Sequence, residues 1–437
     1  MAILNGLVNW VDARLPVVKA FKTHMSEYYA PKNFNFWYYF GVFSLVILIN
    51  QLVTGIWLTM FYSPTDAFAS VEYIMRDVQF GWLIRYMHAA GATVFFAVVY
   101  LHMFRGLMYG SYKPPRELVW IFGMLIYLVL MAEGFLGYVL PWGNMSYWGA
   151  QVIISLVEAV PFQVIPFVDA AQAAEIGQSL TTWVRGDYLL SDATVNKFFA
   201  LHVVALPLVL VALVVMHILA LHEVGSNNPD GVEIKKHKDE NGIPKDGIPF
   251  HPYYTVKDFA GIVVFLMVFA VIVFFFPDGG GYFIESPNYQ PANPMATPEH
   301  IAPVWYYGPF YAMLRAVTID FIFEAKTLGL LVMGGAIAIL FVVPWLDRHP
   351  VKSIRYKGML SKVALALFAV VFVVLGYFGT SPDRVLGSVL GVQITYTKLA
   401  ALGTVYYFAY FLVVLPFAHR FEKSKPVPDR VTTKGGH

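Results

Sequence analysis

The stretch RYMHAAGATVFFAVVYLHMFRG spans residues 85–106 and carries His88 and His102, fourteen positions apart, within an apolar run. A second run, ALHVVALPLVLVALVVMHILALHE at 200–223, carries His202 and His217, fifteen positions apart. An ionisable side chain inside a membrane helix costs free energy and therefore marks a functional site by default. Two such pairs at nearly equal spacing predict two stacked metal cofactors, each held between two helices.

The composition is that of a membrane protein. The 437 residues are 58% hydrophobic and 13% charged, and the mean hydropathy is +0.60. The chain contains no Cys, which excludes disulfides, Cys-ligated iron–sulfur clusters and covalently attached c-type haem. Runs long enough to cross ~30 Å of hydrocarbon lie near 37–60, 83–104, 118–140, 198–221, 259–276, 326–346, 361–379 and 395–418. We therefore predict an all-α membrane protein with eight transmembrane helices and amphipathic surface helices.

The basic residues predict the orientation of these helices. With eight spans both termini share one side, and 22 of the 30 Lys and Arg residues lie in the termini and connections on that side. The positive-inside rule makes that side cytoplasmic. Three regions follow: an N-terminal amphipathic interfacial helix (1–36), the first four spans with an outer loop (37–222), and the last four spans with an outer loop and a basic cytoplasmic tail (223–437).

The direction of the helices decides which histidines face each other. Both runs cross from the outer to the inner side, so His88 pairs with His202 near the outer face and His102 with His217 near the inner face. Fourteen residues fall only ~40° short of four full helical turns, so both histidines of the first run point the same way. Fifteen residues overshoot by ~60°. Because Pro207 interrupts the backbone hydrogen bonding, we expect a local bulge there.

Neutral imidazoles that face each other across a bundle suit iron with two histidine ligands, and we expect two non-covalent b-type haems within the first four helices. Any one of these histidines could instead be bonded to a neighbouring carbonyl. Glycines fourteen positions apart on two other helices leave room for a macrocycle, although each alone is an ordinary packing position. Arginines three positions from a ligand could pair with haem propionates or reach toward the interface. These candidates are Gly41, Gly55, Gly123, Gly137, Arg85 and Arg105.

Three motifs carry a family resemblance: GYVLPWGNMSYWGA (137–150), SNNPDG (226–231) and HPYYTVKD (251–258). They resemble cytochrome b of the cytochrome bc complex, respiratory complex III, and the likeness covers essentially all eight predicted spans. The undivided chain and the fifteen-residue spacing resemble the bacterial type. The resemblance implies a multi-pass protein of the bacterial inner (plasma) membrane, the subunit of a proton-translocating quinol–cytochrome c oxidoreductase.

The resemblance also implies the remaining parts of that enzyme. Ubiquinol is oxidised on the outer side and ubiquinone is reduced on the inner side, in a Q-cycle that moves electrons through a low-potential outer haem and a high-potential inner haem. The implied partners are a Rieske iron–sulfur protein, a c-type cytochrome subunit, a second copy of the complex and membrane lipids. Nothing indicates nucleic acid.

Polar residues at both faces support two quinone sites. A titratable histidine opposite a carboxylate can supply protons to a reduced quinone, although each alone is an ordinary polar helix end. The resemblance assigns to the inner, quinone-reducing site His222, Ser226, Lys257 and Asp258. Aromatic and glycine residues past the third span suit a flat quinol pocket. The candidates for the outer, quinol-oxidising site are Tyr138, Gly149, Trp305 and Tyr311.

One motif departs from the family. Where the family has Pro-Glu-Trp-Tyr, with a Glu thought to accept a quinol proton, this chain has Pro303-Val304-Trp305-Tyr306. Glu299, with His300 beside it, is one candidate replacement. Glu133, inside the apolar run LVLMAEGFLGYVLPW, is another, because burial favours a proton-accepting carboxyl at neutral pH. Glu133 could equally be a neutral group hydrogen-bonded within the bundle.

Two other classes of protein share some of these features. A dihaem membrane anchor of a dehydrogenase would need one quinone site only, and the polar clusters on both faces and the extra helices argue against it. A haem-free transporter with histidine proton relays would show no b-type absorption.

Overall fold

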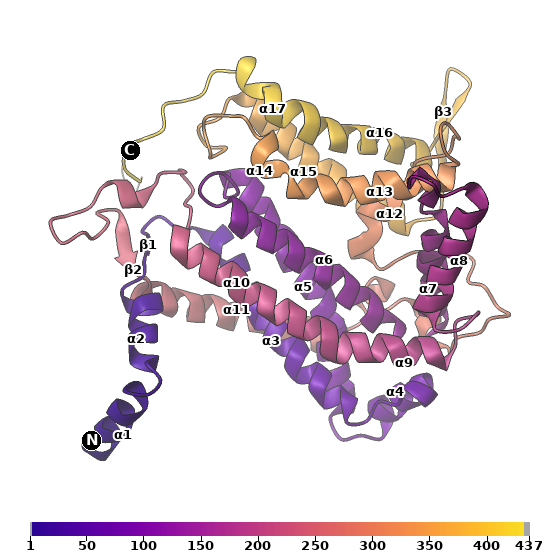
Figure 1. Cartoon of the computed structure of the whole chain (residues 1–437), viewed down its shortest axis with the longest axis horizontal. Helices are drawn as coiled ribbons and strands as arrows, with labels where there is room; N and C mark the ends of the chain where they lie inside the picture. Colours follow the sequence, from indigo (N-terminus) through magenta and orange to yellow (C-terminus); the bar gives the residue numbers. More distant parts are fainter. Residues whose placement is uncertain (1, 432–437) are drawn as a thin grey trace.

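The computed structural model describes residues 2–431, and almost every element is a helix (Figure 1). The helices are α1 (Ala2–Asp12), α2 (Val17–Phe21), α3 (Tyr39–Thr59), α4 (Ala67–Arg76), α5 (Gly81–Tyr109), α6 (Glu117–Val139), α7 (Asn144–Ser155), α8 (Ala170–Arg185), α9 (Asp192–Ala200), α10 (Leu206–Val224), α11 (Thr255–Phe275), α12 (Gly308–Arg315), α13 (Ala325–Phe341), α14 (Val343–Leu346), α15 (Met359–Thr380), α16 (Tyr396–Ala409) and α17 (Leu415–Phe417). Two antiparallel pairs of short strands complete the fold: β1 (Tyr29–Pro31) with β2 (Gly247–Pro249), and β3 (Val385–Val389) with β4 (Val392–Thr395).

Seven helical stretches of the described chain are long and apolar enough to cross a membrane. They are Phe36–Thr59, Gly81–Tyr109, Glu117–Val139, Asp192–Val224, Phe250–Phe275, Met359–Thr380 and Tyr396–Arg420. Each coincides with a predicted span. The remaining predicted span, near 326–346, forms the 17-residue helix α13 and then the short α14, so the count of eight stays a prediction.

The long helices form two groups (Figure 1). In the first, α3 packs on α5 and α6 packs on α10. In the second, α12 packs on α13 and α15, and α15 packs on α16. Helices α1 and α2 and the strands β1 and β2 lie on one side of the molecule, whereas α4, α7, α8 and the β3–β4 hairpin lie on the other (Figure 1). The carboxylate of Asp246 connects the N-terminal and C-terminal segments, because it pairs with Lys32 at 3.0 Å and with Arg430 at 2.6 Å.

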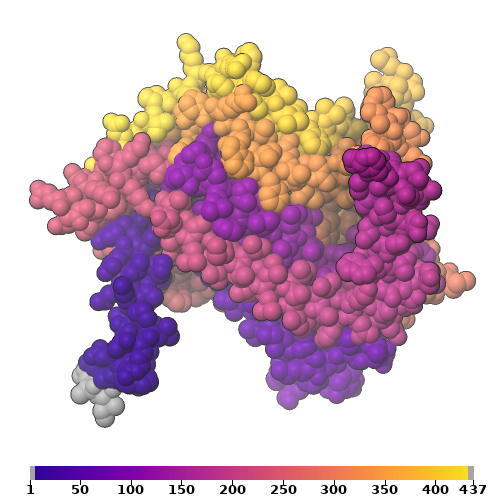
Figure 2. All heavy atoms as spheres, viewed as in Figure 1, coloured from indigo at the N-terminus to yellow at the C-terminus, as the bar shows by residue number. Residues whose placement is uncertain are grey.

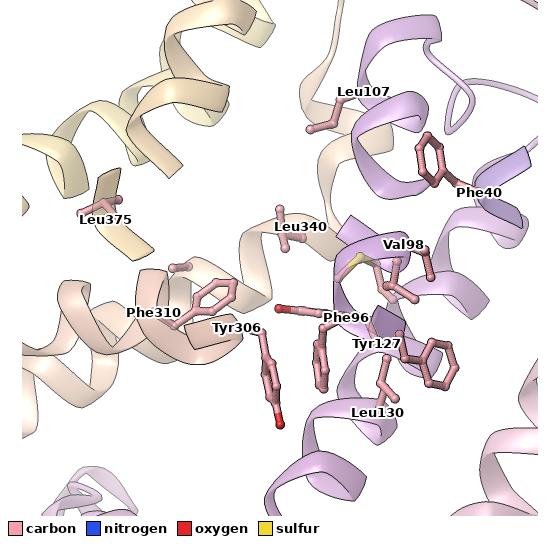
Figure 3. Close-up of a cluster of buried hydrophobic side chains, with 14 of the residues drawn as sticks. Phe40, Phe96, Val98, Leu107, Tyr127, Leu130, Tyr306, Phe310, Leu340 and Leu375 are labelled. Atoms are coloured by element: carbon pink, nitrogen blue, oxygen red, sulfur yellow. The ribbon is translucent and has the colours of Figure 1, made fainter. Parts of the chain in front are cut away.

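Aromatic side chains join the two groups (Figure 3). Tyr306, just before α12, stacks on Phe96 of α5 with a centroid distance of 3.9 Å and an interplanar angle of 5°. The hydroxyl of Tyr100 donates a hydrogen bond to the carbonyl of Tyr306. On the other side of this contact Phe310 lies 6.0 Å from Phe372 of α15. The segment before α12 is therefore held against the helix that carries His88 and His102.

The N-terminal region differs from the single interfacial helix expected over 1–36. Pro16 separates α1 from α2, a π-helical turn follows at Lys22–Ser26, and β1 comes next. This region projects from the body in the space-filling view (Figure 2). The difference has a physical cause: the backbone of Tyr29–Pro31 pairs with Gly247–Pro249, a partner that no local pattern reveals.

Candidate haem and quinone sites

The four histidines meet in the two predicted pairs. The ring centroids of His88 and His202 are 6.3 Å apart, and those of His102 and His217 are 6.4 Å apart. An imidazole nitrogen binds a metal at about 2 Å. Two rings on opposite sides of one metal therefore have centroids about 6 Å apart, once the half-width of each ring is added. Both pairs have the separation that a shared iron requires.

A π-helical turn at Leu201–Ala205 absorbs the extra residue between His202 and His217. The N–H of Leu206 donates to the carbonyl of Leu201, five residues back, and Pro207 follows with no N–H to donate. A π-turn inserts one residue into an α-helix without changing the face that later residues present. The bulge expected near Pro207 is confirmed, and it restores the face that fifteen α-helical residues would have lost.

Each of the four predicted glycines faces one histidine. A Cβ atom added to Gly41 would lie 3.3 Å from Cε1 of His102, and one added to Gly55 would lie 3.1 Å from Cε1 of His88. The corresponding distances are 3.4 Å from Gly123 to His217 and 2.5 Å from Gly137 to His202. The missing side chains thus make room for the imidazole rings, at the two depths that the fourteen-residue spacing predicted.

The inner pair lies in a large cavity. Its volume is about 670 Å³, and its walls include His102, His217, Gly41, Gly123 and Arg105. Nδ1 of His102 and Nε of Arg105 are buried without a hydrogen-bond partner among the described residues. Buried polar atoms normally have partners, so these two fit a bound group. The residues here suit a haem, with Arg105 next to His102 to meet an anionic substituent.

Polar side chains of neighbouring helices lie close to both histidines of the outer pair. Nδ1 of His88 lies 2.9 Å from Oγ1 of Thr54, whose hydroxyl donates to the carbonyl of Asn50. This hydroxyl can accept the Nδ1 proton of His88 and so leave Nε2 free for a metal. Nδ1 of His202 lies 2.7 Å from Oε2 of Glu133, although the two atoms are not aligned as a hydrogen bond. Glu133 is therefore directed at a predicted iron ligand. Arg85 lies within electrostatic range of Tyr289 in the loop after α11.

The predicted inner quinone residues share one space with the inner histidines. His222, Ser226, Lys257 and Asp258 all line the 670 Å³ cavity that also contains His102 and His217. Lys257 Nζ lies 5.3 Å from the ring centroid of Tyr254. A bound quinone there would be close to the inner ligand pair and to groups that can carry protons.

The N-terminal segment supplies two residues of this site that sequence reasoning missed. The ring of Tyr28 stacks on His222 with a centroid distance of 4.5 Å, and its hydroxyl lies 2.9 Å from Oγ of Ser226. Nδ1 of His24, an exposed residue, lies 3.0 Å from Nδ1 of His222. Two facing nitrogens at this distance can share one proton. No local signal marks Tyr28 or His24, because strand pairing between β1 and β2 places Tyr28 in the cavity wall and His24 against His222.

Arg116, another residue that the sequence analysis missed, also lines the cavity. It donates to the carbonyl of Gly225 at 2.8 Å and pairs with Glu233 at 2.6 Å. Burial alone would raise the pKa of Glu233, but Arg116 and Lys352 lower this pKa to about 2. The ion pair fixes the loop that follows α10 and with it Ser226.

The predicted outer quinol residues lie on three elements. Tyr138 lies in the last turn of α6, and the nearest side-chain atom to a Cβ added at Gly149 is Cε1 of Tyr138, at 3.9 Å. Trp305 Nε1 donates to Oγ1 of Thr93 in α5, at 3.4 Å. Tyr311 lies on α12 with Arg315 5.7 Å from its ring centroid. Tyr138 and Gly149 are thus neighbours, and Trp305 lies against the helix that carries His88.

Val304 and the nearby candidates for replacing the family's glutamate, Glu299 and His300, differ in how far they are buried. Val304 is 3% exposed and belongs to the apolar core. Glu299 is exposed, and His300 is half-buried, with burial and then Arg315 lowering the pKa of its imidazole. A carboxylate that sequence reasoning did not consider, Glu285, accepts a hydrogen bond from the hydroxyl of Tyr138 at 3.0 Å.

Comparisons with known proteins cover nearly the whole chain. Residues 25–225 match the family model described as "Cytochrome b/b6/petB", and residues 291–411 match "Cytochrome b(C-terminal)/b6/petD". The chain is similar to cytochrome b of Allochromatium vinosum, with 55% identity over 98% of both chains. It is similar to cytochrome b/c1 of Bradyrhizobium diazoefficiens, with 42% identity over 99% of this chain and 58% of that protein. A solved chain of a hyperthermophilic respiratory complex III matches with a TM-score of 0.82 and 36% identity, over 95% of this chain and 99% of the other.

Proposed function

The chain belongs to the cytochrome b family, and on that premise we propose that it is the dihaem subunit of a bacterial quinol–cytochrome c oxidoreductase that runs a Q-cycle. Cytochrome b is the catalytic subunit of respiratory complex III, so the chain is an integral membrane enzyme subunit. The observation that carries the dihaem proposal is the pair of histidine pairs at 6.3 and 6.4 Å, each ring facing a glycine.

His88 and His202 would hold the outer, low-potential haem, and His102 and His217 would hold the inner, high-potential haem. Two b-type haems supply one-electron transfer across the membrane between the two quinone sites. At the inner site His222, with His24 and Asp258 nearby, would deliver protons to the reduced quinone. At the outer site Tyr138, Gly149, Trp305 and Tyr311 would enclose ubiquinol.

The chain lacks Cys and so has no thiolate ligands for an iron–sulfur cluster and no site for covalent haem. Separate polypeptides must therefore carry the other redox centres, and we infer a Rieske iron–sulfur protein and a c-type cytochrome. The fusion named cytochrome b/c1 in Bradyrhizobium diazoefficiens supports the second partner, because this chain matches 58% of that protein. A homodimeric complex with bound lipid, in the bacterial inner membrane with both termini cytoplasmic, completes the proposal.

A redox titration of the purified complex tests the dihaem proposal. We expect a b-type reduced-minus-oxidised spectrum that titrates in two steps. His202→Ala should abolish one step and His217→Ala the other, because each variant removes one ligand of one pair. His237→Ala, which replaces an exposed histidine, is the matched control and should keep both steps. The absence of b-type absorption in the wild-type complex would refute the proposal. Sensitivity to separate inhibitors of two quinone sites would distinguish the complex from a dihaem anchor.

A further inference from the structure

A closed triangle of hydrogen bonds surrounds the carboxylate of Glu285, in the loop between α11 and α12. The hydroxyl of Tyr138 donates to Oε2 of Glu285 at 3.0 Å. Nδ2 of Asn288 donates to the same oxygen at 3.1 Å and to the hydroxyl oxygen of Tyr138 at 3.0 Å. Tyr138 is a predicted quinol-site residue, so the carboxylate lies directly at that site.

The position of Glu285 is fixed by the motif that follows α6. Oδ1 of Asn288 accepts the backbone N–H of Ser146 at 2.8 Å, at the start of α7. Gly143 allows this approach, since an added Cβ would lie 2.6 Å from that same oxygen. Ala292 donates its N–H to the carbonyl of Trp142 at 2.9 Å. The loop that carries Glu285 is thus docked on residues 142–146 by backbone and side-chain contacts.

Glu285 is also within electrostatic range of the motif Pro303-Val304-Trp305-Tyr306, in which Val304 stands where the family has Glu. Burial, and next the carboxylate of Glu285, raise the pKa of Tyr306, which stands two positions after Val304. Burial raises the pKa of Glu285 itself to about 7, against the opposing hydrogen bonds from Tyr138 and Asn288. Val304 offers only a buried apolar side chain. An acid is therefore present within electrostatic range of Tyr306, but it comes from an earlier part of the loop.

We propose that Glu285 accepts a quinol proton at the outer site, in the role for which Val304 has no suitable group. The inference rests on the proposed function. One quinol O–H bond breaks and its proton forms an O–H bond on the Glu285 carboxylate. The two electrons leave singly, one to the iron–sulfur partner and one to the outer haem. The second O–H bond, on the hydroxyl that faces the iron–sulfur partner, breaks as its proton passes to that partner, and both hydroxyl oxygens become the carbonyl oxygens of the quinone. Glu285 is half-buried and can release its proton to the outer solution.

The other carboxylates fit this role less well. Oε2 of Glu133 is directed at Nδ1 of His202. Glu299 is exposed, and no hydrogen bond among the described residues joins its side chain to Tyr138, Trp305 or Tyr311. Glu285 combines contact with Tyr138, proximity to Tyr306 and partial burial.

The test is the pH dependence of quinol oxidation by the complete complex, measured as outer-haem reduction with the inner quinone site inhibited. The wild-type rate should rise as pH increases through about 7, because the ionised carboxylate is the accepting form. Glu285→Gln keeps an oxygen for Tyr138 but accepts no proton, so the rate should fall about 100-fold and lose this step. Glu175→Gln, on the exposed face of α8, is the control and should match wild type.

Two further variants separate proton transfer from structure. Tyr138→Phe removes a hydrogen bond that favours the ionised form of Glu285, so the step should move to higher pH. Adding Val304→Glu to Glu285→Gln should restore part of the rate. The inference is overturned if Glu285→Gln has a wild-type pH profile with normal haem spectra, or if Glu299→Gln removes the step instead. A wild-type complex whose haems are not reduced by quinol would instead refute the proposed function.

Discussion

Oε2 of Glu133, in the C-terminal third of α6, lies 2.7 Å from Nδ1 of His202 and so at the depth of the outer histidine pair. A carboxylate behind a metal-ligating imidazole increases the basicity of the ligand and so stabilises the oxidised metal. We expect Glu133→Gln to raise the midpoint potential of the outer haem by about 60 mV, the one-electron equivalent of about 1.4 kcal/mol. A redox titration measures this shift. The midpoint potential of the inner haem is the internal control. An unchanged midpoint potential of the outer haem would show that Glu133 does not act on His202 as a charged group.

Gly137 is the most restrictive of the four glycines, since an added Cβ would lie 2.5 Å from His202. Gly137→Ala should displace the imidazole and lower the occupancy or the potential of the outer haem, while the inner haem is unchanged. Gly334→Ala is the matched control, because an added Cβ there meets no atom within 4 Å. Haem content per protein and the two-step titration measure the effect. Equal behaviour of both variants would contradict the tight fit.

The helical fold and the pairing of the four histidines could be predicted because they depend on periodicity within single helices. The lengths of the apolar runs predict the membrane spans. His88 and His102 are as far apart in the chain as Gly41 and Gly55, and this equal spacing predicts two sites at two depths in the membrane. Even the bulge could be anticipated, since the fifteen-residue spacing from His202 to His217, with Pro207 between them, does not fit a regular helix.

The protonation groups could not be predicted in the same way, because they depend on contacts between distant segments. Glu285 faces Tyr138 only after the loop docks on residues 142–146, and Tyr28 reaches Ser226 only through strand pairing. Glu133 was recognised as unusual, but its direction toward His202 depends on how α6 packs on α10.

The contact between Nδ1 of His24 and Nδ1 of His222 predicts that the N-terminal segment helps to deliver protons to the inner quinone site. His24→Ala removes the exposed partner of the 3.0 Å contact and should slow oxidation of the inner haem by quinone. The loss should be smaller than the about 100-fold expected for His222→Ala, which removes a direct proton donor. Rapid-mixing measurements with the outer site inhibited provide the rates. His237→Ala serves as control, and a wild-type rate in His24→Ala would exclude the relay.

The buried carboxylate of Asp347, which follows α14, predicts a position at which a substitution destabilises the protein. Its carboxylate accepts from Tyr112 at 2.7 Å and pairs with Lys113 at 3.1 Å and Lys357 at 3.0 Å, all within the interior. Removing one partner of a buried ion pair costs about 3–5 kcal/mol. Asp347→Ala should therefore lower the thermal-inactivation temperature of the complex markedly. Glu240→Gln, at an exposed position, should not.

Asp347 also predicts how the stability of the protein depends on pH. Burial alone would raise the pKa of Asp347, but Lys357 and Lys113 lower it below its ordinary value. A lowered folded-state pKa gives stabilisation that is present above the unfolded value of about 3.9 and is lost as pH falls below it. Wild type should therefore lose stability on acidification more steeply than Asp347→Asn. Parallel curves of inactivation temperature against pH would contradict this.

The pairing of β1 with β2 also has a consequence for the order in which the protein is made. Residues 29–31 are synthesised more than two hundred positions before residues 247–249. Until the later strand emerges, the segment with His24 and Tyr28 lacks its β-strand partner, although His222 and Ser226, which its side chains contact, are already present. Helices α3, α5, α6 and α10 are complete by then. The wall of the cavity that Tyr28 forms can therefore be completed after the four helices that carry the inner histidines and their glycines have been made.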